Sequence, residues 1–261
     1  MSENKVDISV VVPAHGEGRL AHHTMNSIFR ATKYAGTHGI KTEILVIPDR
    51  ADENTKIYFR RYENSEIRIH HVDFGDPGLS RNYGIHKSSG KYIAFLDADD
   101  LFGKNWLRAA YDEMERDNAF CIYHPEYLIC FEGEDLLIRY KGTEDENFHP
   151  QDLIESNCWT SFFISQKTLL LDNPFAATPS DSGFGYEDWH WICEIIAKGI
   201  AVRIVPESCV FYRKKLHGSR LFKHNYDNVV IRPSKFFEPE TFSLMLKRRA
   251  KNNFRTLDKN K

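Results

Sequence analysis

Residues 91–100 read Lys91-Tyr92-Ile93-Ala94-Phe95-Leu96-Asp97-Ala98-Asp99-Asp100, an apolar run that ends in three carboxylates. The apolar part lacks a helical period, which predicts a buried parallel strand. Open α/β sheets bind ligands at the carboxyl ends of their strands, where these acids lie. Asp97 and Asp99 can face the same side and offer hard oxygen ligands for Mg²⁺ or Mn²⁺. The alternative is a solvated turn that caps a helix beginning near Gly103.

Two earlier segments repeat this pattern of an apolar strand followed by polar residues. Residues 8–12 lead into Pro13-Ala14-His15-Gly16-Glu17-Gly18, and residues 42–47 lead into Pro48-Asp49-Arg50-Ala51-Asp52. The remaining predicted elements of this half are a strand at 66–72 and helices at about 20–35, 53–63 and 79–88. Alternating strands and helices predict an α/β fold with a mixed, mainly parallel sheet flanked by helices.

The second half of the chain is less regular. We predict a helix at about 104–117, a hairpin of strands 119–131 and 135–140, a loop at 174–185, a helix at 186–199, and strands at 201–205 and 209–212. The loop is a candidate for closing over a site. Glu187 and Asp188 fall in the first turn of the 186–199 helix, where acids commonly serve only to stabilise the helix dipole.

The sequence changes character after residue 220, which divides a domain at 1–220 from a C-terminal extension at 221–261. Pro239 opens a predicted helix in this extension. Its apolar residues are spaced four apart, at Phe242, Leu246, Ala250 and Phe254. Basic residues lie between them, so three roles are open: packing on the domain, pairing with a partner, or peripheral contact with an anionic membrane.

Composition excludes several classes of protein. The chain has 261 residues and a net charge of −2, which gives no general attraction to nucleic acid. Its five cysteines are odd in number and form no C-x-x-C pair, which argues against a disulfide framework and a zinc site. The polar amino terminus and the lack of a run of about 18 apolar residues predict a soluble, cytoplasmic protein, with the inner face of the membrane as a candidate location.

Five short segments, taken in order, resemble the family 2 glycosyltransferases, which have the Rossmann-like GT-A fold. The segments are Val10-Val11-Val12-Pro13, Glu43-Ile44-Leu45-Val46-Ile47 followed by Asp49, Gly78-Leu79-Ser80-Arg81-Asn82 before Gly84, Phe95-Leu96-Asp97-Ala98-Asp99-Asp100, and Gly185-Tyr186-Glu187-Asp188-Trp189. The match extends over about residues 6–220. His15 and Pro48 stand where the family often has an aromatic residue and a second Asp. The Q-x-x-R-W element of processive members is missing, which favours transfer of a single sugar.

The resemblance implies a nucleotide-sugar site. Its residues would be Pro13, His15, Glu17, Asp49, Arg81, Asp97, Ala98 and Asp99. Asp49 would accept a hydrogen bond from the imide N–H of a uracil or thymine base, and Arg81 would close the pocket and reach the diphosphate. The divalent cation, Mn²⁺ or Mg²⁺, would be held by Asp99 and Asp97, with His217 as a further ligand.

The resemblance also implies catalytic roles. Asp188 would be the general base that takes the proton of the acceptor hydroxyl, and Glu187 would orient Asp188 or the acceptor. The cation would stabilise the charge that grows on the leaving diphosphate. Trp189 and Trp159 are candidates for stacking on an acceptor sugar, with burial in the core as the alternative.

These residues together lead us to expect an inverting, metal-dependent glycosyltransferase. It would move one sugar from a nucleotide-sugar donor, UDP-linked in our reading, to a glycan or lipid-linked acceptor, as in bacterial surface polysaccharide synthesis. One alternative is a sugar nucleotidyltransferase, although Gly16-Glu17-Gly18 carries an acid where that class resembles a basic phosphate loop. The other alternative is a non-catalytic domain that binds a nucleotide or glycan. The sequence predicts no oligomeric state.

Overall fold

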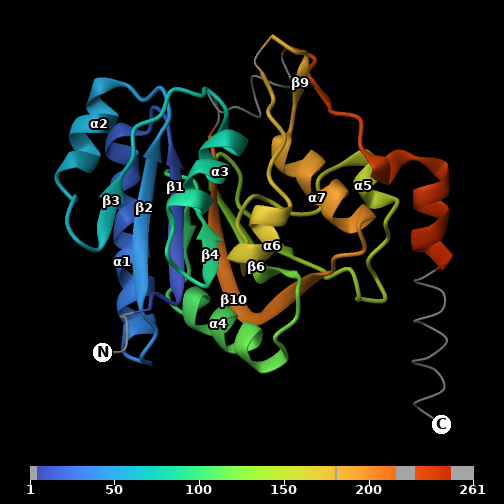
Figure 1. Ribbon diagram of the computed structural model, residues 1–261, viewed down its shortest axis with the longest axis horizontal. Coiled ribbons are helices and arrows are strands. Elements are labelled where there is room, and N and C mark those ends of the chain that lie inside the picture. The colour runs from blue at the N-terminus through green and yellow to red at the C-terminus, as the bar shows by residue number, and fades with distance from the viewer. Residues whose placement is uncertain (1–4, 180, 216–226, 248–261) are drawn as a thin grey trace.

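The computed structural model describes residues 5–179, 181–215 and 227–247 (Figure 1). Within these ranges a nine-stranded sheet forms the centre of the molecule, in the order β3-β2-β1-β4-β8-β6-β10-β5, with β7 paired to β6. Its strands are β1 Ile8–Ala14, β2 Thr42–Pro48, β3 Ile67–Ile69, β4 Tyr92–Phe95, β5 Leu101–Phe102, β6 Ile122–Glu132, β7 Leu136–Arg139, β8 Ile164–Gln166 and β10 Val202–Lys214.

Helices lie on both faces of this sheet (Figure 1). They are α1 Ala21–Gly36, α2 Glu53–Arg60, α3 Pro77–Lys87, α4 Trp106–Asp117, α5 Asp152–Glu155, α6 Lys167–Asp172 and α7 Glu187–Ala197, with short 3-10 helices η1 Gly18–Leu20 and η2 Lys235–Phe237. Helix α3 packs closely on β1, and a Cβ atom at Gly84 would collide with the Val11 side chain. The α/β fold expected from the alternation of strands and helices is confirmed.

The parallel half of the sheet places the strand ends at one edge. β1 pairs in parallel with β2 on one side and with β4 on the other. All four residues of β4 are fully buried, as the apolar run of 92–95 predicted. Ala98 N donates to the carbonyl oxygen of Pro13 at 3.2 Å, so the chain leaving β4 stays beside the end of β1. The strand-end acids therefore reach the same edge.

The other half of the sheet mixes parallel and antiparallel pairs, because β6 and β10 run parallel, and it differs from prediction in its details. β8 runs antiparallel to both β4 and β6, and the predicted hairpin is confirmed as β6 and β7. The two strands predicted at 201–205 and 209–212 form a single strand, β10, with an irregularity between Val205 and Cys209. Pro206 has no N–H to donate and Glu207 has a φ of 55°, so the pairing shifts there without ending.

Two helix starts correct the sequence reading. α3 begins at Pro77, two residues earlier than predicted, because Asp76 accepts a hydrogen bond from Leu79 N and caps the helix. α4 begins at Trp106 after Asn105, which makes no side-chain cap. Asp97 and Asp99 therefore do not cap this helix, which corrects the capping role considered for the acidic turn.

The described part of the C-terminal extension contacts the domain. β11 Val230–Ile231 pairs in parallel with β9 Phe184–Gly185, and η2 places Phe236 in the core. Residues 239–247 are helical, and the Phe242 ring lies 5.6 Å from the Phe236 ring. Ala250 and Phe254 lie outside the described residues. In the part of the chain that is described, no helix combines the length and the apolar character needed to cross a membrane.

Candidate active site

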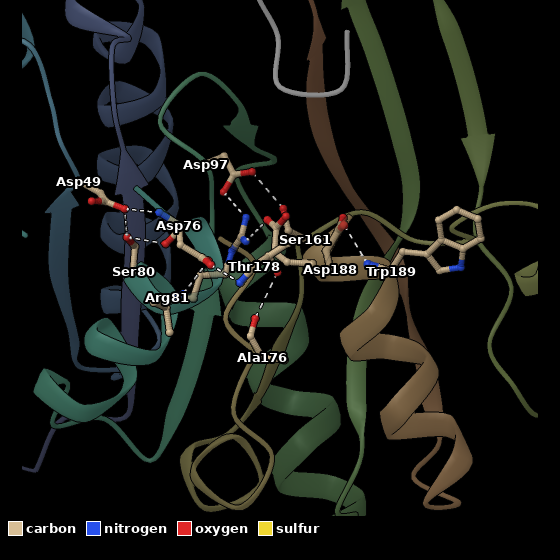
Figure 2. A network of polar contacts seen from close by, with 12 residues as sticks. Asp49, Asp76, Ser80, Arg81, Asp97, Ser161, Ala176, Thr178, Asp188 and Trp189 are labelled. Atoms are coloured by element: carbon tan, nitrogen blue, oxygen red, sulfur yellow. Dashed lines mark hydrogen bonds and ion pairs between the residues drawn. The ribbon is translucent and has the colours of Figure 1, made fainter. Parts of the chain in front are cut away.

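Arg81 of α3 lies at the centre of a polar network near the ends of the parallel strands (Figure 2). Its Nη2 donates to Asp97 Oδ1 at 2.8 Å and its Nη1 donates to Glu187 Oε1 at 3.0 Å. Burial alone would lower the pKa of Arg81, but Asp97, Glu187 and Asp188 outweigh it and raise the pKa above its usual range. The Arg81 side chain is 3% exposed, so it joins two parts of the site from within. Its expected reach to a diphosphate stays a prediction.

Asp97 is fixed by two donors. Besides Arg81, Ser161 Oγ donates to Asp97 Oδ2 at 3.0 Å, and Figure 2 shows both side chains directed at the carboxylate. The Asp97 side chain remains 33% exposed. Each carboxylate oxygen can accept a further bond, so Asp97 is oriented and still accessible to a cation or a hydroxyl.

Asp99 and Asp100 face the end of β10. Asp99 Oδ2 lies 2.6 Å from Lys215 Nζ, and Arg213 Nε donates to the Asp99 carbonyl oxygen. Asp100 is buried and accepts a hydrogen bond from Arg213 N at 2.7 Å. Burial, and then the charges of Asp99 and Asp97, raise the pKa of Asp100 well above its usual range. Asp99 is thus the more accessible of these two acids.

The described residues bring together no group of three His, Cys, Asp or Glu side chains that could hold a metal ion. Mg²⁺ and Mn²⁺ commonly take one or two carboxylates from the protein and complete their coordination with substrate phosphates and water. The oxygens of Asp97 and Asp99 fit that role by their chemistry. His217, the third expected ligand, lies outside the described residues.

Asp49 is buried, 6% exposed, and its carboxylate is held by the loop before α3. Oδ1 accepts from Phe74 N and Gly75 N at 2.8 Å each, and Oδ2 accepts from Asp76 N at 2.9 Å and Ser80 Oγ at 2.8 Å. A carboxylate has about four acceptor positions, so the chain itself uses all of them. The contact expected between Asp49 and the nucleotide base stays a prediction. It requires the N–H of the nucleotide base to share an oxygen with one of these donors or to displace it.

The loop at 174–185 is bonded to α3 at two places. Asn82 Nδ2 donates to the Phe175 carbonyl oxygen, and Phe175 N donates back to Asn82 Oδ1. Thr178 N donates to Asp76 Oδ2 at 2.5 Å. These bonds set the path by which the loop reaches α7, and thereby the place of Asp188.

His15, Glu17 and the backbone around Pro13 form the rim of the site beside Asp49. The exposed His15 ring is oriented by a 2.7 Å contact between Nδ1 and the Asp49 carbonyl oxygen. Glu17 accepts from His15 N, and its pKa is raised by burial and by the nearby Asp99 against the lowering effect of that bond. Pro13 and Ala98 are buried, so they can offer only backbone atoms and shape.

Asp188 lies in the first turn of α7, with Oδ1 accepting from Trp189 N at 2.8 Å and Oδ2 accepting from Asn157 Nδ2 at 3.2 Å. Burial and the charge of Glu187 raise the pKa of Asp188 to about 7, although Arg81 and the Trp189 N–H oppose the shift. A carboxylate that ionises near neutral pH is well matched to accepting a proton from a hydroxyl. α7 begins after Tyr186, whose φ of 55° is unfavourable for a residue with a side chain.

The two tryptophans differ in accessibility. Trp159 is 3% exposed and packs against the rings of Phe148 and His124, so it has no face open to an acceptor sugar. This corrects the acceptor role considered for it, because its ring completes the core. Trp189 is half-buried and donates from Nε1 to the Leu153 carbonyl oxygen. Trp189 therefore stays the candidate for an acceptor contact.

Several contributors to the site were missed from the sequence. They are Asp76, Asn82, Asn157, Ser161 and Lys215. Asp76 carried a usable signal, since an Asp directly before a Pro is typical of a helix start. Asn82 lies in α3, within one of the segments that carry the family resemblance, but nothing in the sequence indicates its contact with Phe175. Asn157, Ser161 and Lys215 are single polar residues outside helices and strands, with no local pattern that marks them.

The sequence model for glycosyl transferase family 2 matches residues 9–172. A Rickettsia conorii protein described as an uncharacterized glycosyltransferase is 31% identical over 72% of this chain and 30% of its own length. Other relatives have named activities, and two of them follow. The Escherichia coli glucosyltransferase WfgD, which is named for UDP-Glc and a GlcNAc-diphosphoundecaprenol acceptor, is 27% identical over 65% of this chain and 63% of its own length. The Staphylococcus aureus poly(ribitol-phosphate) N-acetylglucosaminyltransferase TarP is 26% identical over 69% of this chain and 56% of its own length.

The fold is similar to that of S. aureus TarS, solved in complex with UDP-GlcNAc. The TM-score is 0.63 at 18% identity, over 83% of this chain and 61% of the TarS chain. The chain spans about a fifth to a third of the length of the Rickettsia relatives it matches. The family match covers more than half of the chain and includes the acidic segment after β4. This chain belongs to glycosyltransferase family 2.

Proposed function

We propose that this chain is an inverting, metal-dependent glycosyltransferase that moves one sugar from a UDP-linked donor to a hydroxyl of a glycan or lipid-linked acceptor. The observation that carries the proposal is the ion pairing of Arg81 with both Asp97 and Glu187. It holds the acids after β4 close to the first turn of α7, where the candidate base Asp188 lies. The name of WfgD and the UDP-GlcNAc complex of TarS support a UDP-sugar donor.

Asp97 and Asp99 would hold the Mn²⁺ or Mg²⁺ ion. When bound, that ion would neutralise the charge that develops on the departing diphosphate. Arg81 and Ser161 keep the Asp97 carboxylate in one orientation, so the donor-side acid need not reorganise during the reaction. His15, Glu17 and Asp49 form the rim at which the nucleotide would lie.

Asp188 would take the proton of the acceptor hydroxyl as that oxygen attacks the anomeric carbon. Attack from the face opposite the diphosphate inverts the anomeric configuration. Asn157 and Trp189 N fix the two carboxylate oxygens, which leaves one further acceptor position on each oxygen for the incoming hydroxyl. Arg81 helps to keep Asp188 ionised, while Glu187 raises its affinity for the proton.

The structure gives no specific support to a sugar nucleotidyltransferase. The loop after β1 carries Glu17, whose carboxylate accepts a hydrogen bond from His15 N. The negative charge of Glu17 opposes the binding of a triphosphate at that place. The proposal implies two ligands, a nucleotide-sugar donor and a glycan or lipid-linked acceptor. It implies no binding of nucleic acid.

The test is a transfer assay with the purified chain, a panel of UDP-sugars, Mn²⁺, and glycan and lipid-diphosphate-linked acceptors, read by mass spectrometry. We expect one sugar to be added and UDP to be released, and proton NMR of the product to show the inverted anomeric configuration. A product of retained configuration would contradict the mechanism. Formation of pyrophosphate from a nucleoside triphosphate and a sugar phosphate would replace it with the nucleotidyltransferase.

A further inference from the structure

A small cavity lies directly beside Asp188, on the side toward β6. Its volume, measured as the space open to the centre of a water molecule, is about 10 Å³. Asp188, His124, Thr160 and Ser161 are among its lining residues, together with Trp159 and Trp191, and most of the wall is apolar. A volume of this size holds one water molecule, and such a water is retained where buried polar groups on the wall lack other hydrogen-bond partners.

His124 is the unusual residue in this wall. It lies in β6, is 1% exposed, and neither ring nitrogen has a hydrogen-bond partner in the described part of the protein. Its ring stacks on Trp159, with centroids 5.9 Å apart, and contacts the rings of Tyr140 and Phe163. Leaving buried polar nitrogens without a partner is costly, so such groups in native proteins commonly bind an internal water.

The charge state of His124 follows from the same surroundings. Burial lowers the pKa of His124 to about 3, opposed only by the Phe162 backbone, which makes no hydrogen bond of normal geometry to it. His124 is therefore neutral at the pH at which Asp188 titrates. A neutral imidazole has one N–H donor and one acceptor nitrogen, and either can bind water.

We infer that this cavity binds one water molecule that links His124 to the carboxylate of Asp188, and that His124 is a positioning residue for the base. The inference rests on the role proposed for Asp188. Each Asp188 oxygen accepts one protein hydrogen bond and has one acceptor position left. A water held by His124 can donate to one of these positions, while the other stays available to the acceptor hydroxyl.

The consequence concerns the protonation of Asp188. A hydrogen bond donated to a carboxylate favours its charged form and so lowers its pKa. The charged and titratable groups that face Asp188 from the surrounding elements are Glu187, Arg81, Asp97, Tyr140 and Tyr212. A Phe side chain at 124 keeps a ring against Tyr140, which packs on His124, and alters no charge among these groups. The pKa of Asp188 without the water should therefore be higher than with it.

The experiment compares His124→Phe, which keeps the ring volume without nitrogens, with His124→Gln, which keeps polar atoms. The readout is the carboxyl ¹³C titration of Asp188, assigned by its loss in Asp188→Asn, so it does not depend on activity. We expect His124→Phe to raise the pKa of Asp188 by about one unit, the effect of one hydrogen bond to a charged group. His124→Gln should stay within about 0.3 units of the wild type. Equal pKa values in all three proteins would overturn the inference.

Phe163→Leu is the matched control, because Phe163 lines the same cavity without polar atoms. It should reduce stability while leaving the Asp188 titration unchanged, and a shift as large as that of His124→Phe would assign the effect to packing alone. If His124→Phe does not fold, a high-resolution crystal structure of the wild type decides the matter. Density for a water within hydrogen-bonding distance of both side chains supports the inference, and a dry cavity contradicts it. If the wild-type protein itself transfers no sugar, that result counts against the proposed function and not against this inference.

Discussion

Arg81 Nη1 lies 3.0 Å from Glu187 Oε1, and these two residues are 106 positions apart in the sequence. The contact joins the start of α7 to α3, and the second Nη of the same guanidinium joins α3 to Asp97. One buried cation thus connects the acid that precedes the candidate base with the acids that follow β4.

Replacing Arg81 by Met should destabilise the protein by about 3–5 kcal/mol, because two carboxylates lose their buried cation. Arg81→Lys should recover part of this loss, since one ammonium cannot reproduce a two-armed contact. Urea unfolding measures both. The control is Arg139→Ala, which removes an ion pair from a side chain that is 72% exposed and should cost less than about 1 kcal/mol. Equal losses for Arg81→Met and the control would show that Arg81 has no special role.

Replacing Asp188 by Asn should leave donor binding within about twofold and reduce transfer by about a hundredfold or more, because the amide cannot accept the proton. The Asn side chain has nearly the same shape as that of Asp188. Its amide oxygen can still accept one of the two hydrogen bonds that Trp189 N and Asn157 Nδ2 donate. Calorimetry with UDP and Mn²⁺ measures binding, and the transfer assay measures turnover. An Asp188→Asn variant with wild-type turnover would remove Asp188 as the base.

The rate of transfer should rise with pH through the region around pH 7, because the pKa of Asp188 is raised to about 7 and only the ionised form accepts a proton. Stability should change in the opposite sense. A carboxyl group whose folded pKa is raised stabilises the fold below its unfolded pKa, and this contribution is lost as pH rises through the folded value. Asp188→Asn should therefore gain stability relative to the wild type between pH 5 and pH 8, as measured by thermal unfolding. An unchanged difference across this window would contradict the raised pKa.

Lys215 should compete with a divalent cation for Asp99, since its ammonium lies 2.6 Å from Asp99 Oδ2. Burial lowers the pKa of Lys215, but Asp99 and Glu17 outweigh this effect and raise it, so the ammonium persists. Lys215→Met should strengthen the binding of Mn²⁺ by about five- to tenfold, the equivalent of about 1 kcal/mol.

Titration calorimetry with Mn²⁺ in the presence of UDP measures this effect. Lys214→Met is the matched control, because the adjacent Lys214 pairs with Glu134 and not with the strand-end acids. Its Mn²⁺ affinity should equal that of the wild type. Weaker Mn²⁺ binding by Lys215→Met would show that Lys215 supports the cation site instead of competing for it.

Replacing Asp49 by Asn should destabilise the protein by about 2–4 kcal/mol, because an amide NH₂ would face donors that now bind a carboxylate oxygen. Ser80→Ala removes just one of the four donors and should cost about 1 kcal/mol. Urea unfolding gives both values. If Asp49→Asn weakens UDP binding without changing stability, the Asp49 carboxylate binds the uracil base and does not stabilise the loop.

Local pattern was enough to predict much of the fold. The run from Tyr92 to Phe95 is apolar on both faces and lacks a helical period, which is typical of a buried parallel strand. Because parallel strands end at a common edge, the acids after 95 and the loops after 12 and 47 had to lie near one another. The single strand β10 was missed, since Pro206 and Ser208 are typical of a break and only pairing with β6 shows that the strand continues.

The sequence by itself determined most of the strands and helices within residues 8–140 and 186–212 and the edge at which the acids gather, because these depend on periodicity and on residues close together in the chain. It did not predict α5, β8 or α6 in the segment between them. Only the tertiary structure decided which partner each side chain has. Ser161 with Asp97, Asn157 with Asp188, and the loop amides with Asp49 are contacts across 25 to 64 positions. Such contacts depend on how distant segments pack, and hydrogen bonds act only over a few ångströms, so no local pattern can specify them.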